Sequence, residues 1–147
     1  MKKSPLWVAL ALISVLLIAP VHADERRIVE QITVSEMKDL LQAEGFADVE
    51  IHGDSNLVVR MNGLQVLALV RNGTVVQFRL YMPVEADLGV INEWNMTKMF
   101  TKAYLDRDGD PVLEMDVDLD GGITEARIRD AIRTFSLSQI AFMRELL

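Results

Sequence analysis

Apolar and polar residues alternate through most of residues 49–82, and this pattern predicts consecutive β-strands. Two Asn-Gly pairs, Asn62-Gly63 and Asn72-Gly73, interrupt the alternation. Asn-Gly favours tight hairpins because both residues adopt positive φ at little cost. The sequence therefore predicts a four-stranded antiparallel meander. Its strands are expected at residues 49–52, 57–61, 64–71 and 74–82.

The third of these strands is apolar on both faces. Val66 and Val70 lie on one face, whereas Leu67 and Leu69 lie on the other. A strand of this kind is typical of the centre of a sheet that is covered on both sides. We expect a helix or another subunit to cover the second face over part of the strand.

Three segments show the periodicity and the end signals of helices. Thr33 and Glu36 form a capping-box sequence, and Gly45 follows as the stop. Asp87 is placed to cap a second helix that runs to about residue 96, and Thr124 to cap a last helix. The apolar face of the last helix comprises Ile128, Ala131, Ile132, Phe135, Phe142, Met143 and Leu146.

Near the C-terminus Leu137, Ile140 and Leu147 fall outside that face. Two interpretations remain open for them. Either the helix packs deeply, or these residues form a self-association patch or a groove for another protein.

Asp108-Gly109 predicts a hairpin between strands at residues 100–106 and 110–119. A three-residue loop would place Lys102 opposite Glu114 and Phe100 opposite Asp116, whereas a two-residue loop would shift the pairing by one. The predicted order is α-ββββ-α-ββ-α. This order indicates an α+β fold, an antiparallel sheet with helices mostly on one side.

Acidic residues alternate with apolar ones in the second hairpin strand and allow two interpretations. A solvated sheet face is favoured. The alternative function is calcium binding or calcium stabilisation, because Asp116, Asp118 and Asp120 match the start of an EF-hand loop. Arg127 stands where that loop needs a bidentate Glu, and a strand precedes Asp116 where an EF-hand has a helix.

The N-terminus has the features of a signal peptide, predicted as residues 1–23. Lys2 and Lys3 precede an apolar run at 6–18, and Ala23 suits signal peptidase. We therefore expect a periplasmic or secreted protein without stable membrane insertion after cleavage. An uncleaved anchor is the other interpretation. A polar lead-in at 24–31 and one domain at 32–147 would follow.

Composition and the absence of known motifs disfavour several kinds of partner, metal site and enzymatic activity. The formal net charge is −7, which disfavours nucleic acid as a partner. The chain has no Cys, and His52 is the single His after the predicted cleavage site, so zinc and copper sites are disfavoured. No nucleophile elbow or phosphate-binding loop occurs. We expect no catalytic residues, no cofactor and no enzymatic activity.

Trp94 and Asn95 are adjacent in the sequence but suit different roles. Trp94 suits the core, packing the helix on the sheet, although it could also anchor a partner in a cleft. Asn95 suits the satisfaction of backbone groups at the helix end.

Several motifs in order resemble the YbjN family, described as bacterial sensory-transduction regulators. They are Asn92-Glu93-Trp94-Asn95, Ala103-Tyr104-Leu105-Asp106, Asp108-Gly109-Asp110, Leu113-Glu114-Met115-Asp116 and Gly121-Gly122. The resemblance implies a fold like that of the type III secretion chaperones, a domain that binds other proteins, and a homodimer. It implies no catalytic residues. The signal peptide is a departure, because such chaperones act in the cytoplasm.

The function expected from the sequence is therefore that of an exported, non-enzymatic module that binds another protein. The expected partner-binding residues are Trp94, Asn95, Leu137, Ile140 and Leu147.

Overall fold

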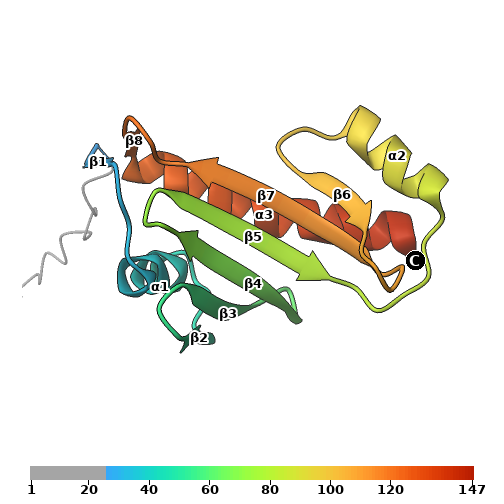
Figure 1. Cartoon of the computed structure of the whole chain (residues 1–147), viewed down its shortest axis with the longest axis horizontal. Coiled ribbons are helices and arrows are strands. Elements are labelled where there is room, and N and C mark those ends of the chain that lie inside the picture. The colour runs from blue at the N-terminus through green and yellow to red at the C-terminus, as the bar shows by residue number, and fades with distance from the viewer. Residues whose placement is uncertain (1–25) are drawn as a thin grey trace, which may run out of the picture.

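A computed structural model describes residues 26–147. The predicted signal peptide lies outside the described residues. The fold is α+β, as predicted, and Figure 1 shows its arrangement. The elements are β1 Ile28–Val29, α1 Val34–Ala43, β2 Val49–His52, β3 Asn56–Met61, β4 Leu64–Arg71, β5 Val75–Tyr81, α2 Leu88–Thr97, β6 Lys102–Leu105, β7 Pro111–Asp118, β8 Ile123–Thr124 and α3 Glu125–Leu146.

The main sheet has six antiparallel strands in the order β2-β3-β4-β5-β7-β6. The four-stranded meander is confirmed, and the β6–β7 hairpin joins it through β7, which pairs with β5. Helices α1 and α3 pack against the same face of the sheet, while α2 lies beside β6 and the end of α3 (Figure 1). Among residues 26–147 no helix is both long and apolar enough to cross a bilayer.

Both Asn-Gly turns have the predicted geometry. Asn62 and Asn72 have φ values of 49° and 52°, and the glycines that follow have positive φ as well. The first turn also docks on α3. The Asn62 side chain donates to the carbonyl of Ser136, 3.0 Å away, while the buried Gln139 amide donates to the carbonyl of Met61 at 2.9 Å. These bonds tie the β3–β4 hairpin to the last helix.

The N-terminus of α1 is also as predicted. Thr33 accepts from the backbone N–H of Glu36 at 3.2 Å, and the Glu36 carboxylate accepts from the N–H of Thr33 at 2.9 Å. Within the expected polar lead-in the structure describes residues 26–31, and there β1 pairs with β8. This pair was not predicted, because each strand has only two residues, too few for an alternation of apolar and polar positions.

The core lies between the sheet and the two helices α1 and α3. Phe78 of β5 stacks on Phe135 of α3 with ring centroids 5.3 Å apart. Helices α1 and α3 lie on the other face, so a cover over the face that carries Leu67 and Leu69 would have to come from another subunit, and that expectation stays a prediction. Leu69 is nevertheless buried. Its cross-strand neighbour Gln77 belongs to a layer of long polar side chains on this face.

Candidate functional site

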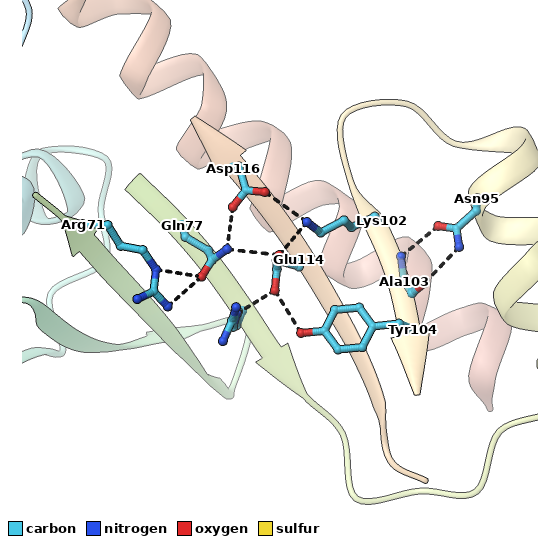
Figure 2. A network of polar contacts seen from close by, with 9 residues as sticks. Arg71, Gln77, Asn95, Lys102, Ala103, Tyr104, Glu114 and Asp116 are labelled. Atoms are coloured by element: carbon cyan, nitrogen blue, oxygen red, sulfur yellow. Dashed lines mark hydrogen bonds and ion pairs between the residues drawn. The ribbon is translucent and has the colours of Figure 1, made fainter. Parts of the chain in front are cut away.

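Asn95 makes a backbone-like pair with β6. Its amide Nδ2 donates to the carbonyl of Ala103 at 2.9 Å, and its Oδ1 accepts from the N–H of Ala103 at 2.8 Å (Figure 2). Both backbone groups on the outer side of Ala103 are thereby satisfied by a side chain from α2. Asn95 thus occupies the place of another strand at this residue and attaches α2 to the sheet.

Trp94, next to it, points into the core. It is 2 % exposed and packs edge-on against Phe142 with centroids 4.9 Å apart. Lys98 covers the ring at 5.5 Å from its centroid. Trp94 and Asn95 therefore hold α2 from two directions, with the indole packed on α3 and the amide bonded to β6.

The β6–β7 hairpin has the three-residue loop, since Lys102 pairs with Glu114 and Leu105 with Pro111. Phe100, in contrast, does not pair with Asp116. It lies outside β6 with φ of 71°, a left-handed conformation that is rare for a bulky residue. The reason is the short connection to α2, which ends at Thr97 and forces the chain away from β7.

The expectation of a solvated acidic face is wrong at Glu114, which is only 3 % exposed. Its carboxylate accepts from Arg79 at 2.6 Å, from Lys102 at 2.7 Å and from the Tyr104 hydroxyl at 2.9 Å. Gln77 donates to it at 3.1 Å (Figure 2). Four side chains from the two neighbouring strands, β5 and β6, thus surround one carboxylate, which makes its burial possible.

The electrostatics favour a charged Glu114. Burial raises the pKa of this carboxyl, but hydrogen bonds from Lys102 and Tyr104 and the charge of Arg79 outweigh burial and leave the pKa below its usual value. Burial and the bond to Glu114 raise the pKa of Tyr104 to about 12. The bonds to Glu114 and Asp116 raise the pKa of Lys102. These mutually satisfied groups hold three strands together.

Two grooves flank α3 and share Phe100 and Thr134. The β7–α3 groove is lined by Phe100, Met115, Asp116, Val117, Asp118, Ile123, Arg127, Ala131 and Thr134. The α2–α3 groove is lined by Trp94, Thr97, Lys98, Met99, Phe100, Thr134, Leu137, Ser138 and Ala141. Arg127 lies over the Phe100 ring, 5.8 Å from its centroid. The grooves therefore meet at an exposed phenylalanine.

A comparison with protein families matches residues 33–146 to YbjN, described as "Putative bacterial sensory transduction regulator". The match spans most of the chain. The chain belongs to the YbjN family. Neither the search of curated proteins nor the search of solved structures gave a match. The resemblance to the type III secretion chaperone fold therefore stays a prediction.

The expected partner-binding residues of this YbjN domain lie in two places. Trp94 forms part of the wall of the α2–α3 groove, and Leu137 stands exposed in it. Ile140 and Leu147 line a further apolar depression with Met143. Asn95 bonds to Ala103 instead of lining either of these surfaces. Sequence reasoning did not find Met99 and Phe100, although both are apolar residues just after a helix end.

The three aspartates of the calcium hypothesis do not converge in the YbjN domain. Asp116 and Asp118 belong to β7, and Asp116 bonds to Lys102 at 3.1 Å and to Gln77 at 2.6 Å. Asp118 accepts from the backbone N–H of Asp120 at 2.9 Å. Residues 26–147 contain no group of three or more acidic, His or Cys side chains placed to hold a metal ion.

Proposed function

We propose that this YbjN domain is a regulatory module that acts by binding another protein, without catalysis and without a cofactor. The observation that carries the proposal is the exposed apolar surface around the α2–α3 groove. Met96, Met99, Phe100 and Leu137 are 75 %, 74 %, 64 % and 68 % exposed. The family's description as a regulator agrees with such a role.

The composition of this surface suits recognition of an apolar segment. Exposed apolar residues that gather beside a groove typically mark interaction sites. Methionine side chains adapt their shape to a partner because they are unbranched and polarizable. Trp94 beneath the groove is fixed by Phe142, so the groove has a rigid wall under a flexible rim.

The binding test uses the chain with an affinity tag and one double variant. We expect Met99→Ser with Leu137→Ser to weaken capture of the partner by tenfold or more, because truncating central contacts of an interface typically costs at least 1 kcal/mol each. Ile51→Thr is the matched control, since Ile51 is also an exposed apolar residue but lies on β2, far along the sheet. Equal capture by the double variant and the wild type would contradict the proposal.

The proposed location is the periplasm or the exterior of the cell, and it rests on the basic, apolar and small-residue pattern of residues 1–23. N-terminal sequencing of the protein from fractionated cells tests it. We expect a mature chain that begins at Asp24 in the periplasmic or extracellular fraction. A chain that retains Met1 in the membrane fraction would support an uncleaved anchor instead.

We also propose that the protein forms a homodimer, as the family resemblance implies. Light scattering of the purified chain should then give twice the mass of one copy. A single-chain mass at high micromolar concentration would argue against the dimer while leaving the partner-binding proposal intact.

A further inference from the structure

Strand β7 is paired on both sides over only half of its length. Residues 111–114 pair with β6, whereas residues 115–118 pair with β5 alone among the described strands. Unpaired strand edges present backbone donors and acceptors to any extended chain. The free half of β7 is therefore a potential place for an additional strand.

The pairing pattern identifies the backbone groups on this free edge. Ala103 directs its N–H and C=O to Asn95, away from β7. Backbone N–H and C=O groups point to alternate sides along an antiparallel strand. Those of Lys102 therefore point towards β7, where Lys102 pairs with Glu114. The same alternation along β7 directs the N–H and C=O of Asp116 and Asp118 to the free edge.

Phe100 keeps this edge free. If β6 continued in register, Phe100 would lie opposite Asp116 and would pair with it. Its φ of 71° instead turns the chain out of the sheet. The aromatic ring then stands at the end of the β7–α3 groove, beside Arg127. A left-handed phenylalanine is costly for the backbone, and such strain gathers at functional sites.

The two faces of the free edge differ in chemistry. Met115 and Val117 lie on the helix side, where the groove is lined by Ala131 and Ile123. Asp116 and Asp118 lie on the other side, where Lys102 already bonds to Asp116 at 3.1 Å. No ion pair joins Asp118 to another residue within 26–147. A chain added here would place alternate residues against an apolar groove and against carboxylates.

A second copy of the chain does not fit this edge. Antiparallel pairing of two β7 edges about a twofold axis would set Asp116 and Asp118 of one copy against the same residues of the other. Like charges in opposed positions destabilise a strand pair. The edge therefore favours a partner whose residues facing β7's carboxylates are basic.

We propose that an extended protein segment with alternating apolar and basic residues adds antiparallel to β7 at residues 115–118. Its apolar side chains enter the β7–α3 groove, and its basic side chains lie beside Asp116 and Asp118. The inference rests on the proposed protein-binding function and names the kind of partner and the mode of binding.

Synthetic peptides test whether a segment binds by adding a strand to β7. A fluorescein-labelled Lys-Val-Lys-Val-Lys-Val-Lys peptide should bind the full chain in an anisotropy titration at low salt. Two control peptides should bind at least tenfold more weakly. One has the same residues in the block order Lys-Lys-Val-Val-Val-Lys-Lys, and the other keeps the alternation but has Glu in place of Lys. In the antiparallel pair the lysine N–H groups bond to β7. Methylation of the lysine backbone nitrogens should therefore weaken binding about tenfold more than methylation of the valine nitrogens.

One position of the protein gives a matched pair of variants. Asp118→Pro removes the edge-facing N–H without removing a bond to β5, and proline is tolerated where an N–H faces solvent. Asp118→Ala removes the same carboxylate but keeps the N–H. We expect Asp118→Pro to bind the alternating peptide about tenfold more weakly than Asp118→Ala. Should Asp118→Pro not fold, the methylated peptides decide the question with the unaltered protein.

The outcomes separate this inference from the proposed function. Equal binding of the alternating and block peptides, or equal effects of the two methylation patterns, would overturn strand addition. Loss of a dimer in Asp118→Pro by light scattering, with no peptide binding, would assign the edge to a second copy and also overturn it. Partner capture that still depends on Met99 and Leu137 would leave the proposed function standing in either case.

Discussion

The side chain of Asn95 satisfies both outward backbone groups of Ala103, with bonds of 2.9 Å and 2.8 Å. A side-chain amide can do this because its NH2 group donates while its oxygen accepts, in the spacing of a peptide group. The pair fixes α2 to β6 and blocks that part of the sheet edge. The Trp-Asn sequence of the family motif therefore has a structural role in this chain.

Asn95→Ala should lower the free energy of unfolding by about 1–2 kcal/mol, the worth of two partly exposed hydrogen bonds. Asn92→Ala, on the same helix, is the control, because it brings the same gain in helix propensity. Urea unfolding measures both variants. Hydrogen exchange at the Ala103 amide should accelerate only in Asn95→Ala, and equal stabilities of the two variants would contradict the role assigned to Asn95.

Glu114 should make stability depend on pH on the acid side. Its pKa is lower in the folded chain than in the unfolded one, so its contribution is present above about pH 4.3 and is lost as pH falls through the folded pKa. Glu114→Gln should cost about 1–3 kcal/mol at pH 7, because Arg79 and Lys102 lose a charged partner. The difference from wild type in urea unfolding should shrink towards pH 3, and a constant difference would contradict this account.

The Tyr104 hydroxyl should lose its proton at a higher pH than an ordinary tyrosine, because its pKa is raised. Its pKa is raised from 10.0 to about 12, so its contribution to stability is complete below pH 10 and is lost as pH rises through about 12. Absorbance at the tyrosinate band, compared between wild type and Tyr104→Phe, isolates this hydroxyl. A difference spectrum that titrates near pH 10 would show that Glu114 does not hold the hydroxyl.

The backbone of Phe100 should tolerate asparagine better than alanine. Asparagine adopts the left-handed region at lower cost, so Phe100→Asn should be about 1 kcal/mol more stable than Phe100→Ala in urea unfolding. Both variants lose the ring and its contact with Arg127, so the comparison isolates the backbone. Equal stabilities would mean that the loop relaxes out of the left-handed conformation when the ring is removed.

Calcium should leave the thermal stability unchanged. Asp116 is held by Lys102 and Gln77, and the described chain places no third carboxylate with it and Asp118. A ligand that binds the folded state raises the melting temperature. We therefore expect melting curves at millimolar calcium and with chelator to coincide. A calcium-dependent rise that Asp118→Ala abolishes would restore the calcium hypothesis.

Residues Glu114 and Gln139 show why part of the fold could not be predicted. Both are polar residues in amphipathic patterns, and both are buried. Glu114 is buried because Arg79, Lys102 and Tyr104 reach it from neighbouring strands. Gln139 is buried because the Asn62 turn and the Met61 carbonyl supply its partners. Lys102 and Tyr104 belong to the same hairpin as Glu114, but Arg79 and the partners of Gln139 lie far away in the sequence, so no local pattern predicts these burials.

The sequence by itself determined the six strands of the main sheet, the two Asn-Gly turns, the capping box at Thr33, the helix start at Thr124 and the α+β class, because each depends on neighbouring residues. The sequence also allowed the register that pairs Lys102 with Glu114, but it left another register equally open. Only the tertiary structure decided that register, the layer of long polar side chains on the second face of the sheet, the bond between Asn95 and Ala103, and the free half of β7. These features depend on which distant segments meet, and that is decided by the packing of the whole chain.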